Sequence, residues 1–431
     1  MTARLDSETL PLVTALGGER DLSERDTAEV FARVVWSRLA EPGDATAGTL
    51  VTAVGAAHAL KLLGTARPAR AAAEALAAVS VAEIGSDPAL SQRQLAAGVK
   101  RWLPRLDRSA TVQDLATAAS LGMRFVTPGC PDWPRQLDDL GAHAPHGLWV
   151  RGQVPLLSEA ALAVVGARAC TGYGSHVTTD LTAAAASAGF SIVSGAAYGV
   201  DAVAHRTALA MDVSTVAVLA GGADRPYPAS HDQLISRIAD RGAVCSELVP
   251  GAAPTRWRFL QRNRLIAALS RAVLVTEAGV RSGTLNTAGH AAELGRALGA
   301  VPGPVTSAAS AGCHRLVREY NASLITSGSE VLELLDAQAD GGFGATDTAA
   351  VAGGGAAEDA AGEDRQPPLH LRVLDALPLR GGRLACDVAA RAGITREEAL
   401  RTLAELELLG YVAQPAEPGG GEPVWRLLRR A

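Results

Sequence analysis

Five arginines lie close together between Thr255 and Thr276, in the stretch TRWRFLQRNRLIAALSRAVLVT, which contains no Asp or Glu. A guanidinium group is always charged and presents a planar fork of donors that suits phosphate oxygens. Trp257 and Phe259 are interleaved with these charges. Because the chain has a formal net charge of −5, the stretch is a local cationic island. It indicates an anion-binding surface, with a solvated basic face and core aromatics as the alternative; its arginines are Arg256, Arg258, Arg262, Arg264 and Arg271.

Four loops rich in glycine, hydroxyl groups or arginine each follow an apolar, β-rich run. Open α/β sheets bind ligands at the carboxyl ends of their strands. Glycine lets the backbone approach a ligand closely, and the following helix offers free N–H groups to an anion. The residues singled out are Gly166, Arg168, Gly172 and Gly174 in the first loop, Ser194 and Gly195 in the second, Arg225 in the third, and Ser282, Gly283 and Thr284 in the fourth.

The same loops carry aromatic rings and one acid. Tyr198 and Tyr227 offer surfaces on which bases could stack. Asp201 either caps the helix that it precedes or faces a ligand, and both interpretations stay open. Arginine, backbone N–H groups and rings in one groove favour a nucleic-acid backbone over a single small molecule. A single strand is favoured over duplex, because no helix rich in arginine is available to read a major groove.

The elements that must position these loops follow an alternating β/α pattern. Apolar, β-rich runs at 162–166, 190–195, 215–222, 243–247, 272–278 and 297–303 are separated by segments of helix length. This alternation predicts an α/β fold with a parallel, doubly wound sheet.

The composition of the chain divides it into four parts. Residues 1–108 show helical periodicity and predict a small helical domain, in which the turn at Val54–Ala57 is either an ordinary helix turn or a helix-hairpin-helix phosphate contact. Residues 109–336 hold the sheet. Residues 337–368 are rich in Gly, Ala and acids, which predicts a disordered linker. Residues 369–431 predict a winged-helix-like domain, whose third helix is acidic and therefore suits protein contact better than DNA.

Several functional classes lack their signatures. The chain has only two lysines, Lys61 and Lys100, and neither lies in a Walker A loop. Its five cysteines form no CxxC pair, which argues against a zinc ribbon or a disulfide framework and favours a cytoplasmic location. No GxSxG, HExxH or compact His/Cys set is present, and we expect no metal, no cofactor, no signal peptide and no membrane span.

The motifs GARACTGYG, SGAAYGVDAVAHRTAL, VLAGGADRPYP, SELVPG, RNRLIAALSRAVLVTEA and SGTLNTAGHAAELGR occur in this order. In this combination the chain closely resembles the DNA-processing protein A (DprA/Smf) family from about Gly122 to Leu335. The resemblance implies an extended Rossmann-like fold, with an N-terminal SAM/helix-hairpin-helix-like domain and a C-terminal winged helix. It also implies a protein without catalytic activity, which binds single-stranded DNA, protects it during natural transformation and helps load the RecA recombinase, usually as a homodimer.

The resemblance also implies roles for particular residues. DNA contacts would come from Arg168 and from Arg262, Asn263 and Arg264 of the RNR triplet, with Ser194, Gly195, Ser282, Gly283 and Thr284 supporting the groove. The stretch 312–317, with Leu316 and Val317, would lie near a dimer surface. After Tyr227-Pro228, where relatives often carry a basic residue and an asparagine, this chain has Ala229, Ser230 and His231. Arg225 is the candidate substitute for that charge.

Two other functions are consistent with parts of the sequence. A nucleoside-5′-monophosphate phosphoribohydrolase would use a similar Rossmann-like fold, but its PGGxGTxxE signature is replaced here by EAGVRSGTLNTAGHAAE. A regulator would read duplex DNA through the C-terminal helix, which the acids of that helix disfavour.

Overall fold

The computed structural model describes residues 6–17, 23–65, 91–337, 368–378, 381–414 and 424–428. The chain forms two compact units, Met1–Asp336 and Ala337–Ala431. The predicted linker falls almost wholly outside the described residues. The boundary predicted at residue 108 stays a prediction, since residues on both sides of it belong to the first unit.

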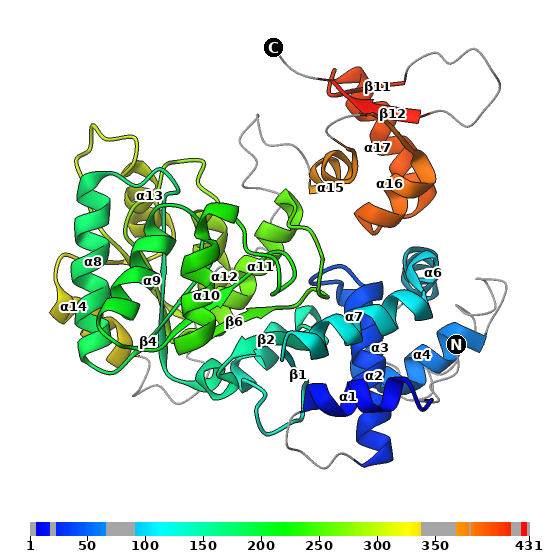
Figure 1. Ribbon diagram of the computed structural model, residues 1–431. Coiled ribbons are helices and arrows are strands. Elements are labelled where there is room, and N and C mark those ends of the chain that lie inside the picture. Colours follow the sequence, from blue (N-terminus) through cyan, green and yellow to red (C-terminus); the bar gives the residue numbers. More distant parts are fainter. Residues whose placement is uncertain are drawn as a thin grey trace. The chain divides into compact units, whose positions relative to one another are not determined.

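A nine-stranded sheet forms the centre of the first unit, in the order β1-β2-β6-β5-β4-β3-β7-β8-β9 (Figure 1). Strands β3 to β9 pair in parallel, and β1 and β2 add an antiparallel edge. The strands are β1 (Arg124–Val126), β2 (Leu148–Gly152), β3 (Ala161–Val165), β4 (Ser191–Ser194), β5 (Thr215–Val218), β6 (Ala243–Ser246), β7 (Ala272–Val275), β8 (Ala297–Ala300) and β9 (Ser323–Leu324). The predicted α/β fold with its parallel sheet is confirmed.

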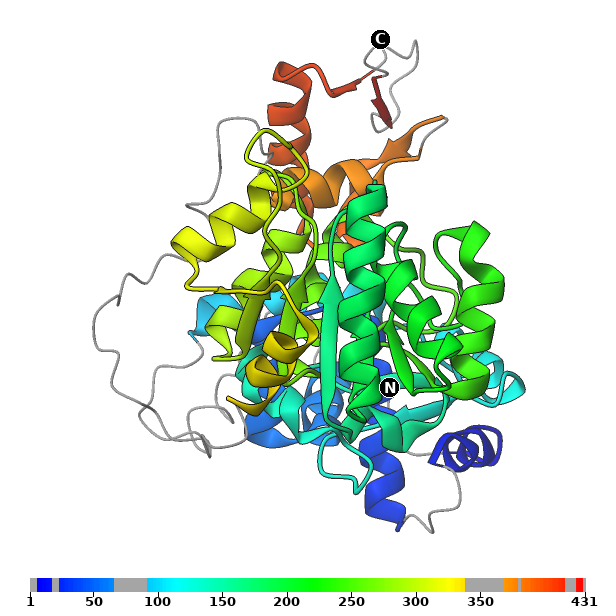
Figure 2. The same ribbon diagram turned by 90° about the vertical axis from the view of Figure 1, so that its left-hand side faces the viewer.

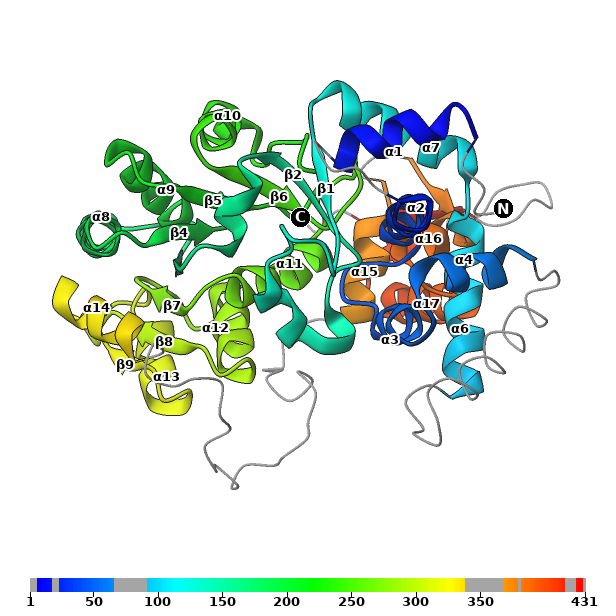
Figure 3. The ribbon, with the colours of Figure 1, turned by 90° about the horizontal axis from the view of Figure 1, so that it is seen from below.

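Helices cover both faces of this sheet because its strands are apolar on both sides. Alternate residues of β3, such as Leu162 and Val164, pack toward α8 (Gly172–Ser187), α9 (Val200–Ala210) and α14 (Gly328–Asp336). The intervening residues pack toward α11 (Arg256–Ala268), α12 (Thr284–Glu293) and α13 (Ala311–Glu319). Helix α10 (Asp232–Arg241) packs on β5 and β6. Figure 3 shows α8, α9 and α10 on one side of the strands and α11, α12 and α13 on the other, and Figure 2 shows α8 as the long green helix near its centre.

The N-terminal helices share a hydrophobic core with the edge of the sheet. Trp36 and Trp102 are fully buried, with ring centroids 5.1 Å apart, and the same cluster includes Phe125 and Trp149 of β1 and β2. The helices are α1 (Thr9–Gly17), α2 (Glu24–Leu39), α3 (Ala45–Val54), α4 (Ala56–Thr65), α6 (Gln92–Trp102) and α7 (Arg108–Ser120). No single described helix is long and apolar enough to cross a membrane; α3 and α4 reach that length and composition only as a pair bent by 108°.

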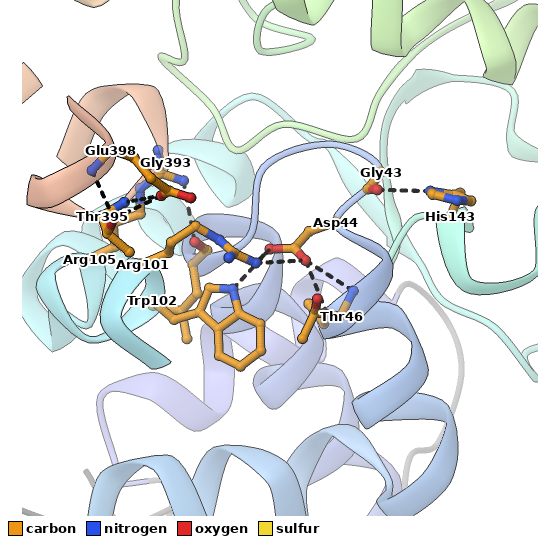
Figure 4. Close-up of polar contacts among 12 residues, drawn as sticks. Gly43, Asp44, Thr46, Arg101, Trp102, Arg105, His143, Gly393, Thr395 and Glu398 are labelled. Atoms are coloured by element: carbon orange, nitrogen blue, oxygen red, sulfur yellow. Dashed lines mark hydrogen bonds and ion pairs between the residues drawn. The ribbon is translucent and has the colours of Figure 1, made fainter. Parts of the chain in front are cut away.

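Asp44 fixes the entry to α3 and joins it to α6. Its carboxylate accepts hydrogen bonds from the backbone of Thr46, from Arg101 and from the Trp102 indole (Figure 4). The neighbouring Gly43 carbonyl lies 2.9 Å from Nδ1 of His143. Asp44 therefore ties α3 to α6, and Gly43 adds a contact to the segment that contains His143.

The described residues of the second unit form three helices and a small antiparallel sheet with their own core. Its elements follow the order α15 (Pro368–Ala376), β10 (Arg383–Leu384), α16 (Ala385–Ala392), α17 (Arg396–Leu408), β11 (Val412–Ala413) and β12 (Val424–Leu427), with β12 central in the sheet. Thr395 and Glu398 form a capping box at the start of α17. This order is the one that the winged-helix prediction requires, and that assignment stays a prediction.

Candidate nucleic-acid interface

The four loops singled out in the sequence meet at one edge of the sheet. Strands β3, β4, β5 and β7 are parallel, so their carboxyl ends face the same way. Strand β3 is followed by β4 on one side, while β7 pairs on its other side, which makes the β3/β7 boundary the topological switch point. Helix α11, which carries most of the cationic stretch, contacts β5 beside this edge.

Arg168 and Arg262 come from different elements and converge on the ring of Phe259. The guanidinium carbon of Arg168 lies 5.0 Å from the Phe259 ring centroid, and that of Arg262 lies 5.9 Å from it. The Tyr227 ring packs against Phe259 with a centroid distance of 5.3 Å. Arg168 is exposed and makes no ion pair or hydrogen bond with any described residue. We call Arg168, Arg262, Phe259 and Tyr227 the arginine–aromatic cluster.

Arg262 is the buried member of this cluster. Its Nη1 donates to the Val218 carbonyl at 2.6 Å, and a Cβ at Gly195 would lie only 1.9 Å from that nitrogen. Burial, partly opposed by Asp201 and reinforced by Arg168, lowers the pKa of Arg262 to about 10, so the side chain stays charged at neutral pH. The glycine at position 195 therefore makes room for the guanidinium.

Arg264 does not join the cluster, which corrects its prediction as a DNA contact. Its Nη2 donates to both carboxylate oxygens of Glu247 at 2.8 Å, and its Nε donates to the His143 carbonyl at 3.0 Å. The side chain is 3% exposed. Because its donors are used inside the protein, Arg264 holds α11 to β6 and to the segment before β2.

Four predicted contact residues use their polar groups internally. Ser194 donates to the Val164 carbonyl, and Thr284 donates to the Gly166 carbonyl. Ser282 bonds the Thr284 hydroxyl and backbone, while Asn263 bonds the Gly283 carbonyl and Asn286. These contacts position the loops, as expected for groove supports, but they place no free donor of Ser194 or Thr284 toward a ligand.

Two exposed arginines extend the cationic surface. Arg256 opens α11, and residues three apart on a helix share a face, so Arg256, Phe259 and Arg262 follow one another along α11. Arg225 is exposed on the β5–α10 loop, where its Nη1 donates to the Gly251 carbonyl at 3.0 Å. Phe259 was not predicted at the site, although its spacing of three residues from Arg256 and from Arg262 was a signal that could have placed it there.

The loop after β4 is closed by Asp201. Its carboxylate accepts hydrogen bonds from the backbone N–H groups of Gly195 and Ala197, at 3.2 and 3.3 Å. Burial raises the pKa of this carboxyl, while Arg262 and the two N–H groups oppose the shift. Neither role left open by the sequence is the observed one: Asp201 lies in the first turn of α9, whose N-cap residue is Gly199, and its carboxylate binds the preceding loop instead of capping the helix or facing a ligand. The Tyr198 ring above the loop is 49% exposed, and its hydroxyl lies 2.7 Å from that of Ser230.

Two further predictions concerned a dimer surface at Leu316 and Val317 and a phosphate contact at the turn Val54–Ala57. Leu316 is fully buried in the core between α13 and the sheet, so it cannot form a dimer surface; Val317 is half-buried beside it. At the turn between α3 and α4, Glu29 accepts hydrogen bonds from the backbone N–H groups of Ala56 and Ala57, both at 3.0 Å. The N–H groups that a helix-hairpin-helix would offer to phosphate are therefore bound to a carboxylate of the same chain.

Comparisons with known proteins show what the chain is similar to. Residues 124–336 match the family described as DNA recombination-mediator protein A. A Mycobacterium tuberculosis (strain H37Rv) protein with the provisional name DNA processing protein DprA is 40% identical over 423 residues, which cover 94% of this chain and 95% of that protein. Protein Smf of Escherichia coli K12 is 37% identical over 279 residues, covering 64% of this chain and 71% of the relative. The X-ray structure of DprA from Streptococcus pneumoniae superposes with a TM-score of 0.55 at 28% identity, over 71% of this chain and 96% of that one.

Proposed function

The chain belongs to the DNA-processing protein A (DprA/Smf) family, and from this premise we propose that it binds single-stranded DNA at the arginine–aromatic cluster and acts as a recombination mediator. The observation that carries the proposal is the exposed guanidinium of Arg168, which lies 5.0 Å from the Phe259 ring beside the exposed Tyr227. A cation that makes no hydrogen bond or ion pair within the described part of the chain, next to aromatic rings, suits a sugar-phosphate chain with unpaired bases.

The geometry favours a single strand over a duplex. Tyr227 and Tyr198 are 47% and 49% exposed, which leaves ring surface for stacking. The bases of a duplex are stacked on one another, whereas those of a single strand can stack on protein rings, at about 1–3 kcal/mol for each base. The arginines Arg168, Arg225 and Arg256 would neutralise the phosphates between such bases.

The finer parts of the proposal come from the family. By its resemblance to this family, the protein would protect incoming single strands during natural transformation and would help load the RecA recombinase. It would act as a homodimer in the cytoplasm. The description of the matched family as a recombination mediator supports this role. We propose no catalytic step, and no observation at the site favours the phosphoribohydrolase alternative.

The test compares Arg168→Glu with Arg237→Glu, a matched control on the exposed face of α10. Fluorescence anisotropy with a labelled oligo-dT should show about tenfold weaker binding or more for Arg168→Glu, because a charge-assisted hydrogen bond contributes about 1.5–3 kcal/mol. The slope of log K against log[salt] should also become shallower by about 0.7, because one phosphate contact is lost. Phe259→Leu should weaken binding with little change in that slope. Equal affinities for the two charge reversals would exclude the cluster as the binding site.

A further inference from the structure

The switch point between β3 and β7 is where an open α/β sheet usually receives its ligand. Here the loops after the two strands are hydrogen-bonded to each other. The Ala167 N–H donates to the Glu277 carbonyl at 2.7 Å, and the Thr284 hydroxyl donates to the Gly166 carbonyl at 3.0 Å. Glu277, which is 3% exposed, lies at this switch point with its carboxylate against the loop after β3.

The Glu277 carboxylate binds the N-terminus of α8 as an anionic ligand would. One of its oxygens accepts from the Thr171 N–H at 2.9 Å, and the other accepts from the Thr171 hydroxyl at 2.7 Å. That hydroxyl in turn accepts from the Gly174 N–H at 3.0 Å. Helix N-termini attract anions through free N–H groups and the helix dipole, and in this helix an internal carboxylate meets that attraction.

Gly174 provides an independent sign that the loop is built around this carboxylate. A Cβ at position 174 would lie 2.4 Å from a Glu277 carboxylate oxygen and 2.8 Å from its carboxyl carbon. The missing side chain therefore lets Glu277 approach the helix. The sequence had suggested the same glycine for the approach of a phosphate.

The bonds to Glu277 also fix the loop that presents Arg168. Thr171, on one side of Arg168, is held by the carboxylate. On the other side, Ala167 donates to the Glu277 backbone and accepts from the Val200 N–H at 3.2 Å. With both flanks fixed, the Arg168 side chain is held over the Phe259 ring.

We propose that Glu277 is the positioning residue for Arg168 and that its carboxylate closes the switch-point crevice to free phosphate and mononucleotides. The DNA strand would then lie outside the crevice, on the arginine–aromatic cluster. This inference rests on the proposed function, because it explains how the same site selects a polymer over its monomers.

The proposal makes a prediction opposite to that of simple electrostatics. Glu277→Gln removes a negative charge near the site, which on charge alone would tighten the binding of DNA. The two donors of Thr171 bind different carboxylate oxygens, and the amide replaces one of these oxygens by an NH₂ group, so one of the two bonds is lost and the loop should loosen. We expect oligo-dT affinity to fall about tenfold, and Arg168→Ala should add little in the Glu277→Gln background although it weakens binding in the wild type.

Three further variants complete the experiment. Thr171→Val keeps the carboxylate and removes one donor, so it should give a smaller loss of oligo-dT affinity. It provides the test if Glu277→Gln folds poorly. Glu293→Gln removes an exposed carboxylate of α12 and should not weaken binding. Glu277→Ala should gain a thermal shift with inorganic phosphate and with 5′-dTMP, whereas the wild type should show none with either.

The outcomes separate the two proposals. If the wild-type protein does not bind oligo-dT, the proposed function fails. If the wild type binds and Arg168→Ala weakens it, but Glu277→Gln and Thr171→Val bind as tightly as the wild type or more tightly, the positioning role is excluded. A thermal shift of the wild type by phosphate or by 5′-dTMP would exclude closure of the crevice.

Discussion

Replacing Arg264 by Met should destabilise the first unit and leave the DNA affinity of the folded protein nearly unchanged. Arg264 donates to both oxygens of Glu247 and to the His143 carbonyl. The variant leaves the carboxylate, with an 11% exposed side chain, without its cation. Removing one partner of a buried ion pair destabilises a protein by about 3–5 kcal/mol, because the remaining charge is uncompensated.

The measurement should follow local stability, because a chain with two compact units need not unfold in one step. Hydrogen exchange in increasing denaturant reports the opening free energy of α11 and β6 directly. A loss of 3 kcal/mol corresponds to exchange about 150-fold faster. Adding Glu247→Leu to Arg264→Met should restore most of the protection, since a well-packed apolar pair often replaces a buried ion pair without loss.

The reasoning would be refuted by a variant that keeps its stability and loses DNA affinity. If Arg264→Met kept the exchange protection of the wild type but weakened oligo-dT binding as much as Arg168→Ala does, the Glu247 ion pair would contribute no stability. Arg264 would then have to reach DNA. Arg237→Met, on the exposed face of α10, controls for the loss of one positive charge.

Two other predictions follow from the same structure. Burial lowers the pKa of His205 to about 3, so below pH 6.5 the folded state binds fewer protons than the unfolded state. The free energy of unfolding should therefore fall by about 1.4 kcal/mol for each pH unit of acidification. His205→Asn, which keeps a partner for Thr215, should remove that slope in a pH series of hydrogen exchange on α9. Ending the chain at Asp336, which removes the second unit, should leave oligo-dT affinity unchanged. The exposed face of α17 carries acids and the 89% exposed Leu408, which do not suit a phosphate backbone. A large loss of affinity would assign strand binding to the second unit.

The sheet could be predicted from the sequence because its signal is local. Each apolar, β-rich run is one buried strand, and a strand buried on both faces needs no partner information to be recognised. The predicted run at 272–278 contains β7, and the run at 162–166 covers β3 except for its first residue, Ala161. The antiparallel edge of β1 and β2 was harder to place, because its order in the sheet depends on contacts between β2 and β6, which are far apart in sequence.

The fate of each arginine could not be predicted, because its partner is distant in the chain. The cationic stretch contains no acid, yet Arg258 pairs with Glu41 and Arg264 pairs with Glu247. Counting charges within the stretch therefore overestimated the cations available to DNA. Likewise, the periodicity of α13 does not show which of its faces meets the sheet, and Leu316 proved to be on the covered one.

The placement of the acids explains how a chain with a net charge of −5 can present a cationic edge. Asp201, Glu247 and Glu277 follow β4, β6 and β7, and each is buried and bound to N–H groups or a guanidinium of the same chain. Their charges are thus compensated internally at the edge where the loops meet. Arg168 has no such internal partner among the described residues and remains for an external anion. Neutralising Glu277 would raise the net charge while loosening the loop that presents Arg168, so this gain in positive charge should weaken DNA binding.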